Sequence, residues 1–227
     1  MIAMNRILPL VFCLFIFSVG FAQRKPIERV VLDNLISETQ FSNDKSEGLE
    51  LVWYIPTEFW EVSFSREKYN NPEETKMIID MLKDYTIVIA IKGKFGMLGG
   101  ITYTPREEIL NNLIVSYNGS KLKHLKQDEL EPDLQNFITM LRPMLKNMMG
   151  KMGENMQVFV YKNDKKRPID VWNKGSIEFK LFDFSPELNL PLGSLLEEKL
   201  CPEDQKMFNG KWSYCPFHGK ELISKDN

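Results

Sequence analysis

The stretch Tyr85-Thr86-Ile87-Val88-Ile89-Ala90-Ile91 decides the fold of this chain. It is rich in β-branched residues, it carries no charged side chain, and it is too short for a typical helix. An apolar run of this kind predicts a strand that is buried on both faces, because a half-buried strand would alternate apolar and polar residues. We therefore expect an interior strand here.

The segments on either side of this strand carry clear start and stop signals. Asn71-Pro72 followed by two glutamates predicts a helix that begins here, with a cap residue and a proline in the first turn. Earlier in the chain, Leu49–Ile55 predicts a strand that ends at Pro56. After the interior strand, glycines lead into Ile101–Tyr103, which predicts a hairpin.

Three further segments near the N-terminal side have weaker patterns. Residues 26–36 have apolar side chains at helical spacing and predict a short amphipathic helix. Residues 39–48 are polar and predict a loop. Residues 61–64 alternate between polar and apolar and predict a second short strand.

The second half of the chain mixes one long helix with alternating segments. Residues 128–149 show helical periodicity, and Pro143 within them predicts a kink. Residues 113–117, 156–162 and 176–184 predict strands. Because strands and helices do not alternate regularly, we expect an α+β fold, a mostly antiparallel sheet or sandwich-like body with helical insertions.

Size and charge limit the class of protein. The chain has 227 residues, a formal charge of −2 and 43% hydrophobic residues. This length allows one ordinary domain with a small appendage, and the apolar content argues against disorder. A charge so close to zero excludes a dedicated nucleic-acid-binding protein, so we expect no nucleic-acid partner.

The N-terminal residues 1–22 have the pattern of a secretory signal peptide. Arg6 precedes an apolar stretch that ends in small residues around Gly20 and Ala22. We expect cleavage before Gln23, or retention of the segment as an anchor, and a periplasmic or extracellular protein with no other membrane span. Removing residues 1–22, which include Arg6 and Cys13, leaves 28 basic and 31 acidic side chains, a formal charge of −3, and two cysteines.

The last residues, 200–227, contain the one group of ligand-type side chains with defined spacing. Cys201-Pro-Glu-Asp204 is followed ten residues later by Cys215-Pro-Phe-His218. Two residues between ligands let a tight turn aim both side chains at one tetrahedral ion. Asn209-Gly210 lies between the two motifs and predicts a two-residue hairpin.

This segment resembles a degenerate zinc ribbon, with Asp204 and His218 where such ribbons usually have cysteine. The resemblance implies a structural zinc held by Cys201, Asp204, Cys215 and His218. A Cys201–Cys215 disulfide is the alternative, because an oxidising compartment favours it and the loop is short enough to be stabilised by it. We expect an α+β body over residues 23–199 and a ribbon-like tail over residues 200–227.

The body offers no comparable site. Residues 55–61 and 210–216 resemble stretches of exported bacterial proteins of unknown function, a resemblance that implies no activity. We expect a non-enzymatic protein that binds another protein or a component of the cell envelope. The alternative is an exported, glycosidase-like hydrolase that uses Glu58 and Glu61 beside Trp53 and Trp60, since carboxylate pairs and aromatic faces suit sugar substrates.

Overall fold

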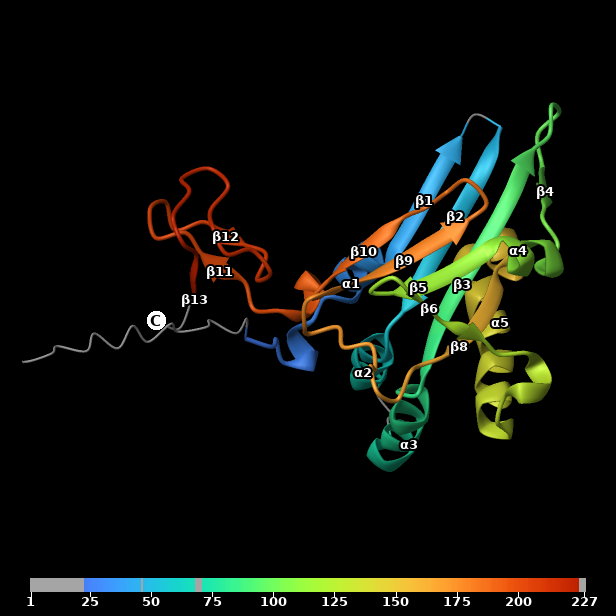
Figure 1. The fold of residues 1–227 in the computed structure, drawn as a ribbon, viewed down its shortest axis with the longest axis horizontal. Coiled ribbons are helices and arrows are strands. Elements are labelled where there is room, and N and C mark those ends of the chain that lie inside the picture. Colours follow the sequence, from blue (N-terminus) through green and yellow to red (C-terminus); the bar gives the residue numbers. More distant parts are fainter. Residues whose placement is uncertain (1–22, 46, 68–70, 225–227) are drawn as a thin grey trace, which may run out of the picture.

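The computed structural model of the protein describes residues 23–45, 47–67 and 71–224, so the expected signal peptide, residues 1–22, lies outside the described residues. The larger sheet has the order β1-β2-β3-β8-β7, with β4 added beside β3 (Figure 1). Its strands are β1 (Gln40–Lys45), β2 (Gly48–Ile55), β3 (Tyr85–Phe95), β4 (Ile101–Tyr103), β7 (Lys123–His124) and β8 (Gln157–Lys162).

A second, smaller sheet lies against one face of the larger sheet (Figure 1). The rings of Phe41 and Phe179 lie 6.1 Å apart across the two sheets. Every strand pair among the described residues is antiparallel. The strands of the second sheet, in order, are β10 (Glu187–Leu190), β9 (Gly175–Leu181), β5 (Leu113–Tyr117) and β6 (Ser120–Lys121).

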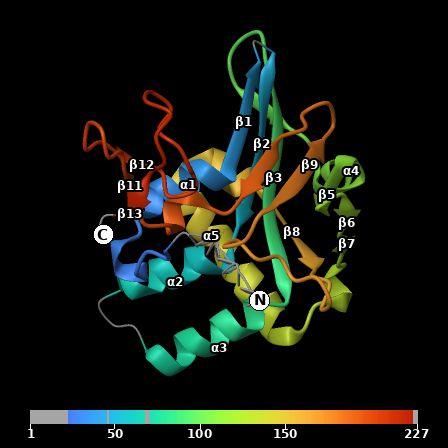
Figure 2. The ribbon, with the colours of Figure 1, turned by 60° about the vertical axis from the view of Figure 1, so that its left-hand side comes forward.

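Helices cover the opposite face of the larger sheet (Figure 2). The ring of Trp53 in β2 meets Phe59 edge to face at 5.6 Å, and Trp60 meets Phe137 at 5.0 Å. These contacts join the sheet, α2 and α5 in one core. The helices are α1 (Leu32–Thr39), α2 (Thr57–Ser65), α3 (Pro72–Leu82), α4 (Arg106–Asn112) and α5 (Pro132–Asn155), with short 3₁₀ turns η1 (Ile27–Arg29), η2 (Gln127–Glu129) and η3 (Gly193–Leu195).

The interior position of β3 confirms the expectation from its sequence. β3 pairs with β2 on one side and β8 on the other. Its residues from Ile87 to Ile91 are at most 2% exposed, on both faces. Since one face meets the second sheet and the other meets helices, neither face tolerates a polar side chain. The predicted α+β fold is confirmed.

The start of α3 is also confirmed, and its cap explains why. The side chain of Asn71 accepts a hydrogen bond from the backbone N–H of Glu73 at 3.1 Å. Pro72 occupies the first turn, where a missing N–H costs nothing because that group has no partner within the helix.

Two sequence predictions near the N-terminal side are wrong. The predicted loop at residues 39–48 contains β1, because an edge strand needs backbone pairing with β2 and little apolar surface. The predicted strand at residues 61–64 belongs to α2. Phe59, Trp60 and Val62 are buried there, and Trp60 contacts Phe64 one helical turn later at 6.3 Å, so packing overrides the alternation.

The break in α5 lies elsewhere than predicted. Pro143 lies inside the helix, and the one non-helical residue within α5 is Gly150, with φ 58° and ψ −132°. A left-handed φ of this kind suits glycine because it has no Cβ.

Candidate metal centre

The tail is built from two loops with the same backbone geometry, residues 201–206 and 215–220. In each loop the N–H of the cysteine donates to the carbonyl of the lysine five residues later, at 2.9 Å and 2.8 Å. Gln205 and Gly219, four residues after each cysteine, donate back to the cysteine carbonyl, and both have left-handed φ values of 59° and 63°. The two motifs therefore fold as matching turns, as their Cys-Pro spacing predicts.

Three short strands join these turns. β11 (Lys199–Leu200) enters the first loop, and β12 (Met207–Phe208) leaves it and pairs with β11. β13 (Ile223–Ser224) follows the second loop and pairs with the other edge of β11. The predicted Asn209-Gly210 hairpin is wrong, because β12 pairs with the preceding strand β11 and not with a strand that follows Gly210. Asn209 and Gly210 instead form a turn that leads toward the second loop.

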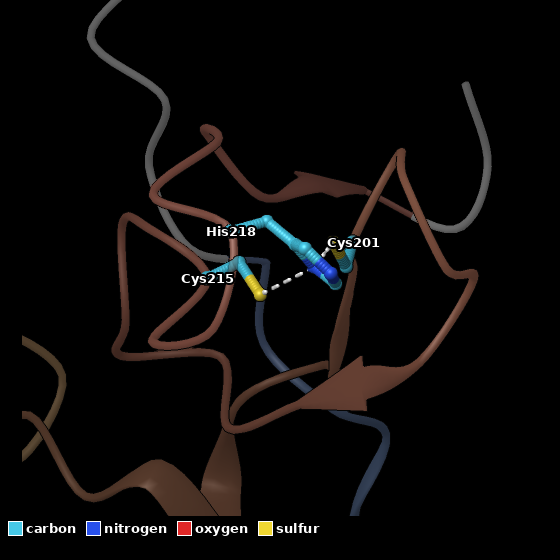
Figure 3. Close-up of side chains that lie close together, drawn as sticks. All are labelled: Cys201, Cys215 and His218. Atoms are coloured by element: carbon cyan, nitrogen blue, oxygen red, sulfur yellow. Dashed lines mark hydrogen bonds between the residues drawn. The ribbon is translucent and has the colours of Figure 1, made fainter.

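The two turns bring Cys201, Cys215 and His218 together (Figure 3). Nδ1 of His218 lies 3.5 Å from the sulfur of Cys201 and 3.5 Å from that of Cys215. The three ligand atoms all lie within 4.8 Å of one another. Both cysteines are free and buried, with exposed fractions of 0% and 1%. Two thiol sulfurs and one ring nitrogen converging in this way could hold a metal ion.

Asp204, the fourth predicted ligand, lies beside this group rather than within it. Its carboxylate accepts from the backbone N–H of Lys206 at 3.2 Å and pairs with the ammonium of the same lysine at 3.3 Å. It also hydrogen-bonds with the thiol of Cys201. Asp204 holds the same position in the first loop as His218 in the second, three residues after the cysteine.

The two thiols differ in their readiness to ionise. Burial raises the pKa of Cys201 above that of an ordinary thiol. Burial also opposes ionisation of Cys215, but hydrogen bonds from the backbone N–H groups of His218 and Phe217 outweigh it and lower the pKa of that thiol. The second loop therefore favours the thiolate form that binds metals.

The tail has a very small core and a conspicuous surface. Its buried hydrophobic side chains are Cys201, Cys215 and Leu222, with Phe208 packed against them. Large apolar side chains in the same module stay exposed, Phe217 to 74%. The others are Met207, Trp212, Tyr214 and Ile223.

Glu58 and Glu61, the carboxylates of the alternative hydrolase prediction, do not lie beside exposed tryptophan rings. Trp53 and Trp60 are 1% and 3% exposed, so their rings pack in the core rather than face solvent. Glu58 lies next to Trp172, which hydrogen-bonds with it. Burial, reinforced by the charges of Glu61 and Asp170, raises the pKa of Glu58 to about 7. Asp170 and Trp172 could not be predicted as neighbours of Glu58, because they lie more than a hundred residues further along the chain.

Comparisons with known proteins add no relative: no protein-family model, no curated protein and no solved structure matches this chain. None of the described helices is long and apolar enough to cross a membrane.

Proposed function

We propose that this protein is an exported binding protein of the cell envelope whose tail is closed by a structural zinc ion. The observation that carries the proposal is the meeting of Cys201, Cys215 and His218 at the ends of two matching turns. Together with residues 1–22, whose pattern is that of a secretory signal, this geometry favours a stabilised extracytoplasmic module.

The distances suit zinc. Bonds of about 2.3 Å to sulfur and about 2.0 Å to nitrogen, at a tetrahedral angle, place sulfur and nitrogen about 3.5 Å apart. His218 Nδ1 has this separation from both sulfurs. Asp204, the counterpart of His218 in the first loop, would supply the fourth ligand by turning from Lys206. A closed site of four protein ligands supports structure rather than catalysis.

The need for such an ion follows from the size of the tail. Three buried side chains bury too little apolar surface to hold a module of some 25 residues, so a metal or a disulfide is required to offset its conformational entropy. Once held, the module presents Trp212, Tyr214 and Phe217 to solvent. Exposed aromatic side chains of this kind favour an interaction with another protein.

The experiment is metal analysis of residues 23–227 purified from the exporting host, together with a thiol count. We expect one zinc per chain and two thiols that react only after chelation. Cys215→Ser should lose the zinc, whereas the nearby Ser213→Ala should keep it. No metal together with no free thiol would show the Cys201–Cys215 disulfide instead and overturn the zinc proposal. The mature chain should begin at Gln23.

A second candidate function rests on Glu58. A carboxyl group with a pKa of about 7 beside Asp170 and Glu61 suits a general acid, as in hydrolases that use paired carboxylates. Hydrolysis of aryl glycosides that disappears in Glu58→Gln, but persists in the exposed Glu187→Gln, would favour this function. If no aryl glycoside of a panel is hydrolysed, the hydrolase function is rejected and the proposed binding function stands.

A further inference from the structure

A cavity of about 220 Å³ lies between α5, η2 and the outer edge of the larger sheet. One part of its wall is apolar, formed by Leu130, Ile138, Val158 and Val160 among others. Another part carries Arg106 and Arg142. The cavity belongs to the body and is independent of the metal centre.

Arg106 reaches the cavity because β7 is short. β7 pairs with β8 only at Tyr161 and Lys162, so the carbonyl of Val158 further along β8 has no strand partner on that side. Nη1 of Arg106 donates to this carbonyl at 2.7 Å, and the guanidinium lies 4.5 Å from the ring centre of Phe159. One end of the guanidinium is therefore anchored, and its remaining N–H groups are available to a ligand.

The positive charge at this cavity is uncompensated among the described residues. Neither Arg106 nor Arg142 forms an ion pair there. Burial, and then the charge of Arg142, lower the pKa of Arg106, so the two guanidinium groups repel each other. An anion between them would screen the repulsion and offset the energetic cost of desolvating Arg106.

The groups around Arg106 supply no such anion. His124 and Tyr161 lie near it on β7 and β8, and the buried Nε2 and hydroxyl of these residues have no partner among the described residues. Glu129, which acts on His124, is already paired with Lys123 at 2.7 Å. The counter-charge must therefore come from outside the described chain.

A second basic cleft provides a contrast. It lies beside β6 and β7, and three of its cations already have carboxylate partners in the protein. They are Lys123, Lys162 and Arg167. The cavity at Arg106 is thus the stronger candidate for an anion.

We propose that this cavity binds a small carboxylate with an apolar chain, its carboxylate between Arg106 and Arg142 and its chain against Ile138, Val158 and Val160. A volume of about 220 Å³ corresponds to roughly seven water-sized groups at ~30 Å³ each, which fits an acid of six to eight non-hydrogen atoms. The planar guanidinium matches a carboxylate in two-point geometry, and the apolar wall accounts for the chain.

Calorimetric titration of residues 23–227 with hexanoate tests this proposal. We expect saturable binding of one hexanoate per chain, at least tenfold weaker in Arg142→Gln and unchanged in Lys151→Gln. Arg142 and Lys151 are both exposed on α5 without a side-chain partner among the described residues, so both variants should fold. Arg106→Gln, compared by far-ultraviolet circular dichroism with the wild type, should also bind more weakly.

Inorganic phosphate and hexanol separate the two halves of the site. Hexanol lacks the negative charge and should bind at least tenfold more weakly than hexanoate. Phosphate lacks the apolar chain and should also bind at least tenfold more weakly than hexanoate. Phosphate binding equal to or tighter than hexanoate would overturn the apolar part of the proposal. Failure of hexanoate to saturate, or equal affinity in Arg142→Gln and wild type, would overturn the proposal as a whole.

Discussion

Glu38 of α1 and Lys211 of the tail form an ion pair in which Oε1 and Nζ lie 3.0 Å apart. The same carboxylate accepts the backbone N–H groups of Gly193 and Ser194, each at 2.8 Å. One side chain therefore ties the first helix to the turn η3 and to the tail, both of which lie more than 150 residues further along the chain.

Replacing this carboxylate should loosen the junction. Glu38→Gln loses the charge and one acceptor oxygen, and we expect a loss of about 1–3 kcal/mol in the free energy of unfolding at pH 7. Burial raises the pKa of Glu38, but hydrogen bonds from Ser194, Lys211 and Gly193 outweigh it and lower the pKa below the ordinary 4.5. The stabilisation is therefore complete above about pH 4.5, the ordinary pKa of the unfolded carboxyl, and it is lost as the pH falls through the folded-state pKa.

Urea denaturation at pH 7 and at stepwise lower pH checks this expectation. The difference between wild type and Glu38→Gln should shrink below pH ~4.5, where the unfolded carboxyl also begins to bind its proton. Glu187→Gln changes an exposed side chain of β10 that has no hydrogen bond or ion pair among the described residues, and it should change stability little at any pH. A difference that does not depend on pH would contradict the role of the ionised carboxylate.

Gly210 sets how closely the tail approaches the body. A Cβ built at Gly210 would lie 2.2 Å from the carbonyl oxygen of Glu197 and 2.8 Å from Cβ of Leu196. Since the nearest atom is backbone, Gly210→Ala should force the tail away and cost about 1–3 kcal/mol. Gly219→Ala is the matched variant, because its Cβ would have no neighbour within 4 Å. Its only destabilisation should come from the left-handed φ of 63°.

The two alanine variants are distinguished by hydrogen exchange. In Gly210→Ala we expect faster amide exchange at the contact with the body, at Glu197 and Trp212. In Gly219→Ala, faster exchange should be confined to the second loop, with a cost of about 1–2 kcal/mol. The same exchange pattern in both variants would mean that Gly210 does not hold the tail against the body.

How far the sequence predicts this fold depends on how local the determining interaction is. The run Ile87–Ile91 identifies its own burial, and Asn71-Pro72 carries the cap of α3 within two residues. β1 could not be found, because its partner β2 determines it and its own residues are polar. Residues 61–64 alternate like a strand, but they are helical because α2 buries Trp60 and Val62 in the core, where Trp60 also meets the distant Phe137.

The candidate sites also divide into features that local sequence determines and features that depend on distant contacts. Spacing alone selected Cys201, Cys215 and His218, since each loop is short enough to fix its own geometry. The repeated Cys-Pro-x-x-x-Lys pattern of both loops was a signal that could have predicted their matching turns. The cavity at Arg106 and Arg142 could not be predicted, because it needs the premature end of β7 and a helix from another part of the chain.

Glu58 should make stability depend on pH in the opposite sense to Glu38. Burial raises the pKa of Glu58 to about 7, so the folded state resists ionisation of this carboxyl. The unfolded chain releases the proton near the ordinary 4.5, and stability should fall as the pH rises from about 4.5 to about 7, by roughly 2–3 kcal/mol. Glu58→Gln removes this penalty.

We therefore expect Glu58→Gln to be more stable than wild type at pH 8 and nearly equal to it at pH 4.5. Unfolding in urea at both pH values measures the difference, and Glu187→Gln again serves as the control. An equal effect at the two pH values would show that the carboxyl of Glu58 is ionised in the folded protein at neutral pH.

The last prediction concerns Asp204 as the fourth ligand, and it rests on the proposed zinc site. Loss of a partner outside the coordination sphere typically weakens metal binding 10–100-fold, so Asp204→Ala should weaken zinc binding by at least about 100-fold if the carboxylate binds the ion directly. Asp204→His should keep tight binding, because it repeats the chemistry of His218 at the matching place in the first loop.

Glu203→Ala is the matched control, since Glu203 is exposed next to Asp204 and only its backbone, not its carboxylate, hydrogen-bonds with the thiol of Cys201. Competition with a chromophoric chelator gives the affinities of all three variants. Equal affinity in Asp204→Ala and Glu203→Ala would exclude the carboxylate as a ligand. The ion would then be held by Cys201, Cys215 and His218 alone, and its fourth position would be open to water or to a group from a partner, which would make the centre a site for binding rather than only for structure.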